Sequence, residues 1–327
     1  MHKLPTWLLN AWRLAKAVGS SDLHLLSSQK PRWRIHGQLC IAHDLPPCPP
    51  APWPDITPIA IGHALEHDGA WSEPALGRVR WNLSANESGL LLCLRLINEH
   101  IPSATALQIT QPQLALMQHK QGLVLVTGAT GSGKSSTLAA LVQHWRSQHQ
   151  GHVLTLEDPI EFCYPSADDL VSQRAIGRDS HSFADALRAG LRQDPDLILI
   201  GELRDLETAR LALSAAETGH LVLTTLHTRT AISAIDRLLC LFPGNEQAQA
   251  RMQLADSLIA VLAQELIWRQ GQAAACREVL INTPAVRHLI RDQQINQIHS
   301  LMQTGQSLGM QTRDQAYARL SLCTDGL

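Results

Sequence analysis

The residues of this 327-residue chain best suited to chemistry lie in the segment LVLVTGATGSGKSST, from Leu123 to Thr137. The segment fits the pattern G-x-x-x-x-G-K-[ST], with an apolar run before it and helical spacing after it. Its glycines let backbone N–H groups turn inward around a phosphate, and the following helix adds partial positive charge. The sequence therefore predicts a phosphate-binding loop made of Gly128, Ala129, Thr130, Gly131, Ser132, Gly133, Lys134, Ser135 and Ser136.

Two side chains of this loop have specific roles in nucleotide chemistry. The ammonium group of Lys134 is expected to reach the β- and γ-phosphates, and the hydroxyl group of Ser135 is expected to bind Mg²⁺. We therefore expect ATP and Mg²⁺ as cofactors. A glycine-rich turn that binds nothing is the alternative, and the strand and helix on either side of the loop disfavour it.

Acidic residues follow two other apolar runs. Glu202 comes just after Leu197–Ile200, and Glu157 follows a second run in the motif TLEDP. Ligands of open α/β sheets bind at the carboxyl ends of the strands, where these two carboxylates are expected to lie. Glu202 is predicted to hold Mg²⁺ through water or to orient the attacking water, and Glu157 is a second catalytic candidate. Either one alone would be an ordinary solvated loop charge.

A histidine follows a further apolar strand. His227 comes directly after Leu221–Leu226 and is expected at the same sheet edge. The chain has 16 histidines, so a chance position is as plausible as a role as γ-phosphate sensor or water positioner. His227 is kept as the third catalytic candidate.

The chain from residue 106 onward has the pattern of an α/β domain. Short apolar runs alternate with helical stretches, as expected for strands buried on both faces of a parallel sheet. Ser182 to Asp185 looks like a capping box that opens a helix ending before Pro195. Beyond Glu246 the pattern is mostly helical. The predicted strands are Leu123–Val126, His152–Leu156, Leu197–Ile200 and Leu221–Leu226.

The first 105 residues have a different pattern, which indicates a small α+β domain. A helix is predicted near the N-terminus, with Trp7, Leu8, Ala11, Leu14, Ala15 and Val18 on one face. Paired strands are predicted at Arg78–Asn82 and Leu90–Ile97, another pair with a turn at His36-Gly37, and a short helix at Ile59–His67. The proline-rich stretch Leu45–Pro54 is predicted to be a loop. We therefore expect two domains, 1–105 and 106–327.

Composition narrows the class of protein and its partners. The net charge is -2 and the pI is near 6.8, so a nucleic-acid partner is not expected. No apolar run approaches the roughly 18 residues of a membrane span. The seven cysteines include no CxxC pair, which favours reduced, buried thiols in a cytoplasmic protein.

The order of motifs resembles the secretion-system ATPases that power type IV pili and type II secretion. The similarity extends over GATGSGKSST, TLEDPIEF, ALRAGLRQDPDLILIGELRD and AETGHLVLTTLHTRTA. Three further stretches resemble the PilT-like branch, which retracts pili in twitching motility. They are SDLHL at 21–25, AVRHLIRD at 285–292 and MQTGQSLGMQTRDQA at 302–316.

This resemblance implies a PAS-like N-terminal domain and a RecA-like P-loop ATPase domain, assembled as a homo-hexamer with ATP between the two domains. It gives Glu202 the role of the catalytic glutamate, Glu157 a place near the attacking water and His227 the conserved position of the histidine motif. It also implies phosphate contacts by Arg78, Arg80 and Arg95, for which surface arginines on an edge strand are the alternative.

The resemblance further implies a partner. This is an inner-membrane pilus platform protein, which would hold the ATPase at the membrane without a membrane span of its own. The candidate contact motif comprises Ala285, Arg287, Leu289, Ile290 and Arg291. The chain departs from the family in this motif at His288 and Asp292, and in the turn Ser84–Gly89, which lacks a basic residue. It also lacks the CxxC pairs of the assembly and type II secretion ATPases, which favours the retraction branch.

Three functional hypotheses remain. The first is a hexameric motor ATPase for pilus retraction. The second is a divergent paralogue that acts in type II secretion or pilus assembly, or as a nucleotide-gated regulator. The third, a RecA-like nucleic-acid translocase, is disfavoured because the chain is nearly neutral and has no basic stripe interleaved with aromatic residues.

Overall fold

The computed structural model describes residues 4–35, 37–54, 56, 66–97, 100–165, 167–269 and 272–322. The chain divides into two compact units, Met1–His100 (unit 1) and Ile101–Leu327 (unit 2). The expected domain boundary after residue 105 lies slightly beyond this division.

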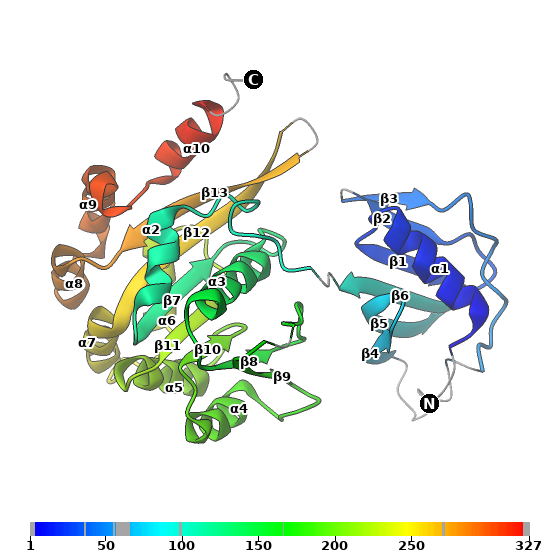
Figure 1. Ribbon diagram of the computed structural model, residues 1–327, viewed down its shortest axis with the longest axis horizontal. Helices are drawn as coiled ribbons and strands as arrows, with labels where there is room; N and C mark the ends of the chain where they lie inside the picture. The colour runs from blue at the N-terminus through cyan, green and yellow to red at the C-terminus, as the bar shows by residue number, and fades with distance from the viewer. Residues whose placement is uncertain are drawn as a thin grey trace. The chain divides into compact units, whose positions relative to one another are not determined.

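The described part of unit 1 contains an antiparallel sheet and one helix, α1 (Thr6–Ala17) (Figure 1). The strand order is β3-β2-β1-β6-β5-β4, and every neighbouring pair is antiparallel. The strands are β1 (Asp22–Leu26), β2 (Arg32–Ile35), β3 (Gln38–Ile41), β4 (Glu66–Glu73), β5 (Gly77–Asn86) and β6 (Gly89–Ile97). The predicted strands at Arg78–Asn82 and Leu90–Ile97 are confirmed as neighbours, β5 and β6.

The two faces of this sheet differ because successive strand residues point in opposite directions. One face packs in the core with α1 and carries buried side chains such as Val79, Trp81 and Leu94. The opposite face is polar. On α1 the buried positions include Trp12, whereas Leu14 and Val18 are 38% and 40% exposed. The prediction that Leu14 and Val18 lie on the buried face of this helix was therefore wrong.

Other expectations for unit 1 have mixed outcomes. Strands β2 and β3 pair as predicted, and His36 of their expected turn lies outside the described residues. Most of the predicted helix Ile59–His67 also lies outside the described residues. Its last two residues belong to β4, so the helix prediction was wrong for these two. The PAS-like character of the unit stays a prediction.

Unit 2 is built around a seven-stranded sheet in the order β13-β12-β7-β11-β10-β8-β9. All neighbouring pairs are parallel except β12 and β13. The strands are β7 (Gly122–Thr127), β8 (His152–Glu157), β9 (Leu170–Ala175), β10 (Leu197–Ile200), β11 (Leu221–Leu226), β12 (Leu258–Arg269) and β13 (Gln272–Ile281). The four strands predicted from apolar runs are confirmed as β7, β8, β10 and β11, side by side in the centre of the sheet.

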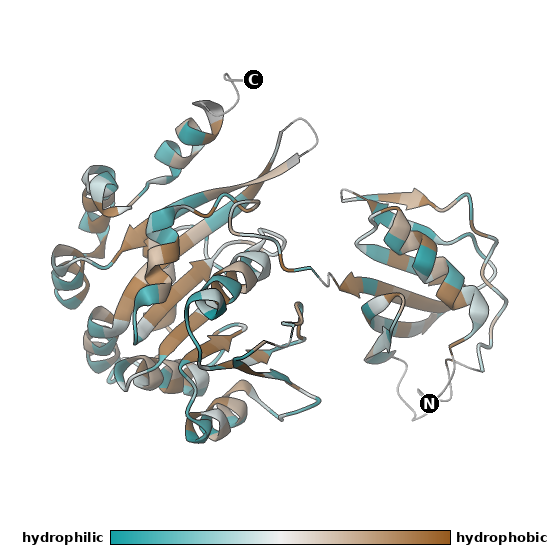
Figure 2. Ribbon diagram, viewed as in Figure 1, coloured by the Kyte–Doolittle hydropathy of each residue, from teal (hydrophilic) through white to brown (hydrophobic). Residues whose placement is uncertain are grey.

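Helices cover both faces of this sheet, so its central strands are buried and apolar (Figure 2). Side chains of α2 and α3 pack on one face, and those of α4 to α9 contribute to the core on the other. The helices are α2 (Gln111–Ala115), α3 (Lys134–Gln148), α4 (Phe183–Gly190), α5 (Leu206–Glu217), α6 (Ala231–Leu239), α7 (Gln247–Ser257), α8 (Pro284–Arg291), α9 (Ile298–Thr304) and α10 (Arg313–Leu322). This covering leaves the strand ends as the places where polar groups of the central sheet can gather.

Local signals set some helix ends as predicted. The backbone N–H of Asp185 donates to the side chain of Ser182 at 3.0 Å, which caps the start of α4. The helix ends at Gly190, before Pro195.

The prediction of a mostly helical tail was wrong for Leu258–Arg269 and Gln272–Ile281. This stretch forms the hairpin β12–β13, and every residue from Leu258 to Gln264 is buried. A continuous apolar run of this kind fits a buried helix or a buried strand equally well by periodicity. Pairing of β12 with the free side of β7 makes it a strand.

The cysteine prediction holds only in part. None of the six cysteines among the described residues forms a disulfide, but Cys40, Cys163 and Cys240 are exposed rather than buried. Cys323 lies outside the described residues. In the described part of the chain, no helix combines the length and the apolar character needed to cross a membrane.

Candidate active site

The sheet topology of unit 2 brings the predicted site residues to one edge. Strands β7, β11, β10 and β8 are consecutive, parallel neighbours, so their carboxyl ends lie together. The phosphate loop follows β7, and Glu157 is the last residue of β8. His227 directly follows β11, and Glu202 lies just beyond β10.

The glycines of the loop adopt backbone angles that other residues rarely accept. The φ angles are +151° at Gly128, +80° at Gly131 and +83° at Gly133, which is the N-cap of α3. A Cβ atom on Gly128 would also lie 2.2 Å from the carbonyl oxygen of Gln264 on β12. The loop thus closes tightly against β12, and the N-terminus of α3 follows it directly, as a phosphate site requires.

The polar groups of the loop fit a phosphate ligand. Lys134 donates from Nζ to the carbonyl oxygens of Gly128 and Ala129 at 2.9 and 3.1 Å, so its ammonium group lies over the loop. Burial lowers the pKa of Lys134, and the carboxylates of Glu161 and Glu202 act in the opposite direction. The hydroxyl oxygen of Ser132 is buried without a hydrogen-bond partner. Such an unsatisfied atom is costly and is readily satisfied by a bound oxyanion.

Glu202 lies between two basic side chains. Its carboxylate forms an ion pair with Arg204, and its Oε2 lies 2.9 Å from Nε2 of His227, which donates in the tautomer protonated there. Only 13% of the Glu202 side chain is exposed. Arg204 also approaches Asp158 at 3.9 Å, so it connects the ends of β10 and β8.

Glu157, like Glu202, is only partly exposed. Burial raises the pKa of Glu157, although hydrogen bonds favour its charged form. Thr155 Oγ1 donates to Oε1 at 2.7 Å, and the backbone N–H of Glu161 donates to Oε2 at 3.3 Å. A carboxyl group with a raised pKa at this sheet edge has the character of a proton acceptor.

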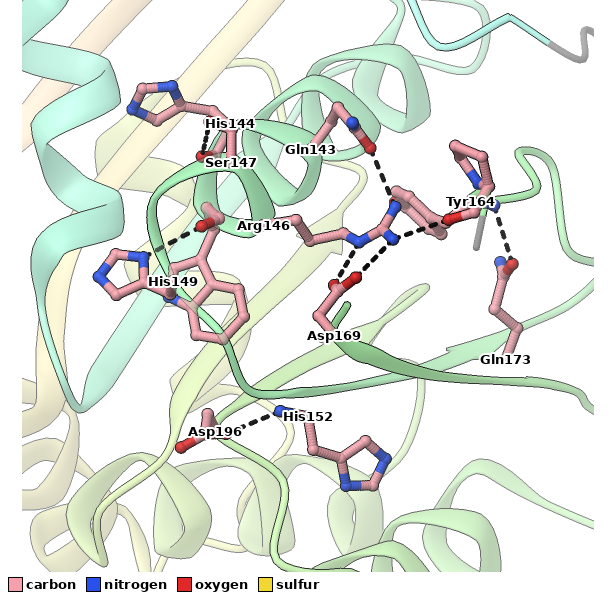
Figure 3. Close-up of polar contacts among 12 residues, drawn as sticks. Gln143, His144, Arg146, Ser147, His149, His152, Tyr164, Asp169, Gln173 and Asp196 are labelled. Carbon is pink, nitrogen blue, oxygen red and sulfur yellow. Dashed lines mark hydrogen bonds and ion pairs between the residues drawn. The ribbon is translucent and has the colours of Figure 1, made fainter. Parts of the chain in front are cut away.

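The segment after Glu157 is held against the phosphate-loop helix by a buried ion pair (Figure 3). Arg146 on α3 contacts Asp169 through two hydrogen bonds, at 2.5 and 2.8 Å, and their side chains are 3% and 4% exposed. Gln173 on β9 accepts from the backbone N–H of Tyr164 at 3.1 Å and donates to the carbonyl oxygen of Phe162 at 2.8 Å. These contacts fix the loop between β8 and β9, and thereby Glu157 and Glu161.

Three residues of the site were missed from sequence. Arg204 and Glu161 stand inside the motifs GELRD and EDPIEF, so their position beside the acidic candidates was a usable signal. Gln264 had no signal, because its place beside the loop depends on the pairing of β12 with β7. His220, at the start of the histidine motif, precedes β11, and its carbonyl oxygen accepts from Gly122 at the opposite sheet edge.

The three candidate arginines of unit 1 share the polar face of its sheet. Arg80 on β5 pairs with Arg95 on β6, and Arg78 lies two residues from Arg80 on the same face. Arg95 donates to Asp22 at 2.9 Å. Strand register adds Arg32 and Arg34 of β2 to this face, which we call the arginine face.

The five residues of the predicted partner motif lie on α8 with different exposures. Ile290 is fully buried in the core, and Leu289 packs against it. Ala285 and Arg291 are exposed, and Arg291 forms an ion pair with Asp256. Arg287 lines a cavity of about 430 Å³ that also includes Gly122 and Leu258, at the sheet edge opposite the phosphate loop. The exposed residues of α8 are therefore Pro284, Ala285, His288 and Arg291.

Comparison with known proteins agrees with this geometry. The model of the family described as Type II/IV secretion system protein matches residues 89–318. The chain belongs to this family of secretion ATPases. It is 42% identical to the type IV pilus retraction ATPase PilT of Pseudomonas aeruginosa, over 94% of this chain and 90% of the relative. It is 48% identical to the protein YggR of Escherichia coli K12, over 91% of this chain and 93% of the relative.

Solved structures extend the comparison to three dimensions. The pilus retraction motor PilT with bound ADP matches with a TM-score of 0.87 and 37% identity, over 97% of this chain and 93% of that chain. The family and this similarity make the protein a PilT-like ATPase that binds a nucleotide and hydrolyses ATP. The α/β fold of unit 2 with its largely parallel sheet is thereby confirmed.

Proposed function

We propose that the protein is a hexameric motor that couples ATP hydrolysis to type IV pilus retraction through an inner-membrane platform protein. The observation that carries this proposal is the gathering of the phosphate loop, Glu157, Glu202 and His227 at one sheet edge, in a fold that matches PilT over nearly its whole length. The protein would work in the cytoplasm at the inner membrane, held there by its partner.

The site chemistry assigns a role to each residue. Lys134 binds the β- and γ-phosphates, and Ser135 supplies a hydroxyl ligand to Mg²⁺, with Glu202 acting on the ion through water. The described residues contain no group of three or more metal-ligating side chains, which agrees with an ion held largely by phosphates and water. Glu202 and Glu157 orient and deprotonate the attacking water, and His227 monitors the γ-phosphate through its contact with Glu202.

The arginine face supports phosphate contact by unit 1. Five of the arginines of a nearly neutral module share one sheet face, where their charges add. We assign Arg78, Arg80 and Arg95 to the nucleotide phosphates, because guanidinium groups stabilise the charge of the transferring phosphoryl group.

Helix α8 supports a partner contact away from the nucleotide. Its exposed residues Ala285 and Arg291, together with Arg287 at the cavity, offer a small polar surface at the sheet edge opposite the phosphate loop, where Asp256 pairs with Arg291. A polar segment of the platform protein is the matching partner. Nucleotide chemistry and mechanical output would then use opposite edges of one sheet.

The test combines enzymology with pilus imaging. ATP turnover per subunit is measured against protein concentration, and a rise as subunits associate is expected for a site completed within a ring. A strain lacking the protein is then complemented with the parent or with Lys134→Ala, which removes the phosphate-binding ammonium. Pili that persist on the surface without twitching in the Lys134→Ala strain support a retraction motor.

The same site also fits a paralogue that serves pilus assembly or type II secretion, and the imaging separates these outcomes. Absence of surface pili in the Lys134→Ala strain would indicate assembly. Normal pili and twitching, combined with loss of a secreted protein, would indicate secretion and overturn the retraction proposal.

A further inference from the structure

Arg277 on β13 is a buried arginine for which the nucleotide site gives no explanation. Its residue is 4% exposed, and burial lowers its pKa to about 10, so the guanidinium stays charged at neutral pH. Among the described residues, no carboxylate pairs with it: its hydrogen bonds go to two carbonyl oxygens, an amide oxygen and a hydroxyl oxygen. A buried charge without a counter-ion is costly. Its hydrogen bonds to neutral partners are strong, because the donor is charged.

One side of this cluster holds the phosphate loop. Arg277 donates to Thr137 Oγ1 at 3.2 Å and to Gln264 Oε1 at 3.3 Å, and Thr137 Oγ1 donates to the same Gln264 oxygen at 2.8 Å. Gln264 Nε2 then donates to the carbonyl oxygen of Ser132 inside the loop, at 2.5 Å. Arg277, Thr137, Gln264 and Ser132 are all buried. Because protein interiors are closely packed, a shift of the loop is expected to move Gln264 and its neighbours.

The other side of the cluster holds the start of unit 2. Arg277 Nη1 donates to the carbonyl oxygens of Leu107 at 2.7 Å and Gln108 at 3.4 Å. These residues belong to the segment 101–109, which directly follows the division between the two units. Gln108 has a φ angle of +54°, a left-handed conformation that a non-glycine residue adopts only when its surroundings hold it. The guanidinium contributes to that hold, together with the backbone hydrogen bonds that Gln108 and Ile109 donate within the turn.

We propose that Arg277 is a positioning residue that couples nucleotide occupancy of the phosphate loop to the segment 101–109, through Gln264 and Thr137. A bound phosphate repositions Ser132, and Gln264 moves with it because the two are hydrogen-bonded. The guanidinium, which donates to Gln264, then changes its hydrogen bonds to the carbonyl groups of Leu107 and Gln108. The inference deepens the proposed function by naming a path from the site to the inter-unit connection. It rests on nucleotide binding at the loop and not on pilus retraction.

Hydrogen exchange of the full chain, with and without ADP and Mg²⁺, tests this coupling. The informative amides are those of 128–137 in the loop and of Leu107, Gln108 and Ile109, which donate within their own turn. In the parent, ADP is expected to change exchange in both regions by about 5-fold or more. In Arg277→Met the loop should still respond, whereas the response at residues 107–109 should disappear.

The nucleotide-dependent difference separates coupling from a merely structural role. If Arg277 only stabilises the turn, Arg277→Met raises exchange at 107–109 equally with and without ADP, and the response to ADP remains. That result overturns the proposal. Arg277→Lys keeps the charge but cannot reach all four acceptors, so it should restore part of the response. Arg174→Met removes an arginine of β9 that donates to Gln193, outside the cluster, and should behave like the parent.

A second variant keeps the test valid if Arg277→Met does not fold. Thr137→Val preserves shape and removes one oxygen of the cluster, and it should reduce the response at 107–109 while the loop still binds ADP. A parent-like response in this variant contradicts the proposal. If ADP protects the loop of the parent without any change at 107–109, only the coupling proposal is refuted. If ADP does not protect the loop, nucleotide binding at this site is refuted as well.

Discussion

The two sheets of this protein place their charged residues by different rules. In unit 1, strands alternate between a buried apolar face and a polar face, so the arginines of β2, β5 and β6 spread over a surface. In unit 2, helices cover both faces, and polar groups gather at the strand ends or in buried pairs. Charged side chains on the polar face of unit 1 remain in contact with water, whereas buried charged side chains in unit 2 depend on defined partners.

This difference predicts which substitutions are severe. Changes at the strand ends of unit 2 should affect catalysis most, changes in its buried pairs should affect stability, and changes on the arginine face should leave stability nearly unchanged. The predictions below descend in size along this series.

The largest effect is expected for Glu202→Gln. The substitution preserves size and removes the carboxylate that contacts His227, so ATP turnover should fall by ~10²–10⁴-fold while nucleotide binding persists. Steady-state turnover and ADP binding measure the two properties separately. Glu207→Gln, an exposed glutamate at the start of α5, is the matched control. Parent-like turnover in Glu202→Gln would refute the catalytic assignment.

The buried pair of Arg146 and Asp169 should dominate stability. Asp169→Asn leaves the buried Arg146 guanidinium without its carboxylate, although Gln143 and Pro165 still accept hydrogen bonds from it, so the free energy of unfolding should fall by about 3 kcal/mol at neutral pH. Denaturant unfolding measures this loss. A loss below about 1 kcal/mol would place this pair with exposed ones and remove the contrast between the two units.

The same pair predicts a pH dependence. The hydrogen bond from Arg146 lowers the pKa of Asp169 below its unfolded value, although burial opposes this. An acid whose pKa is lowered by folding stabilises the fold above its unfolded pKa, near 3.9, and this contribution is lost as the pH falls through the folded pKa. The difference in stability between the parent and Asp169→Asn should therefore shrink only in acid below about pH 4. A difference that shrinks near neutral pH would contradict the assignment.

A smaller effect is expected for Gly128→Ala. The new methyl group meets the carbonyl oxygen of Gln264, and the φ angle of +151° is unfavourable for alanine, with strain of about 1–3 kcal/mol. ADP affinity measured by calorimetry should fall as the loop distorts. Gly219→Ala also requires a positive φ but meets no neighbouring atom and lies beside His220 at the opposite sheet edge, so it controls for backbone strain away from the loop. Equal ADP affinities in the two variants would show that the contact with β12 is unimportant.

The smallest effect on stability is expected for Asp22→Asn on the arginine face. In this pair the Arg95 side chain is 68% exposed and the Asp22 side chain 15%, so the pair is more hydrated than the Asp169 pair, and removing it should cost about 1 kcal/mol or less. The same unfolding measurement applies. A loss comparable with that of Asp169→Asn would show that unit 1 depends on buried charge in the same way as unit 2.

Much of unit 2 was predictable because its signals are local. The strands Leu123–Val126 and Leu197–Ile200 were found as continuous apolar runs, and Ser182 was found as a cap, since each feature depends on a few adjacent residues. The hairpin β12–β13 was missed, because its apolar run matches a helix as well as a strand. Exposure of Leu14 and Val18 was missed for a related reason, since the core that α1 covers is built by distant strands.

The candidate site divides in the same way. The loop from Gly128 to Ser136, Glu157, Glu202 and His227 follow strands that the sequence reveals, and the rule that parallel strands end at one edge brings them together. The sequence by itself determined these residues, because backbone angles and strand ends are properties of short segments. Only the tertiary structure decided the partners of Gln264 and Arg277 and the approach of Arg204 to Asp158. Their contacts join segments as distant as Leu107 and Arg277, and such contacts arise from strand order rather than from spacing.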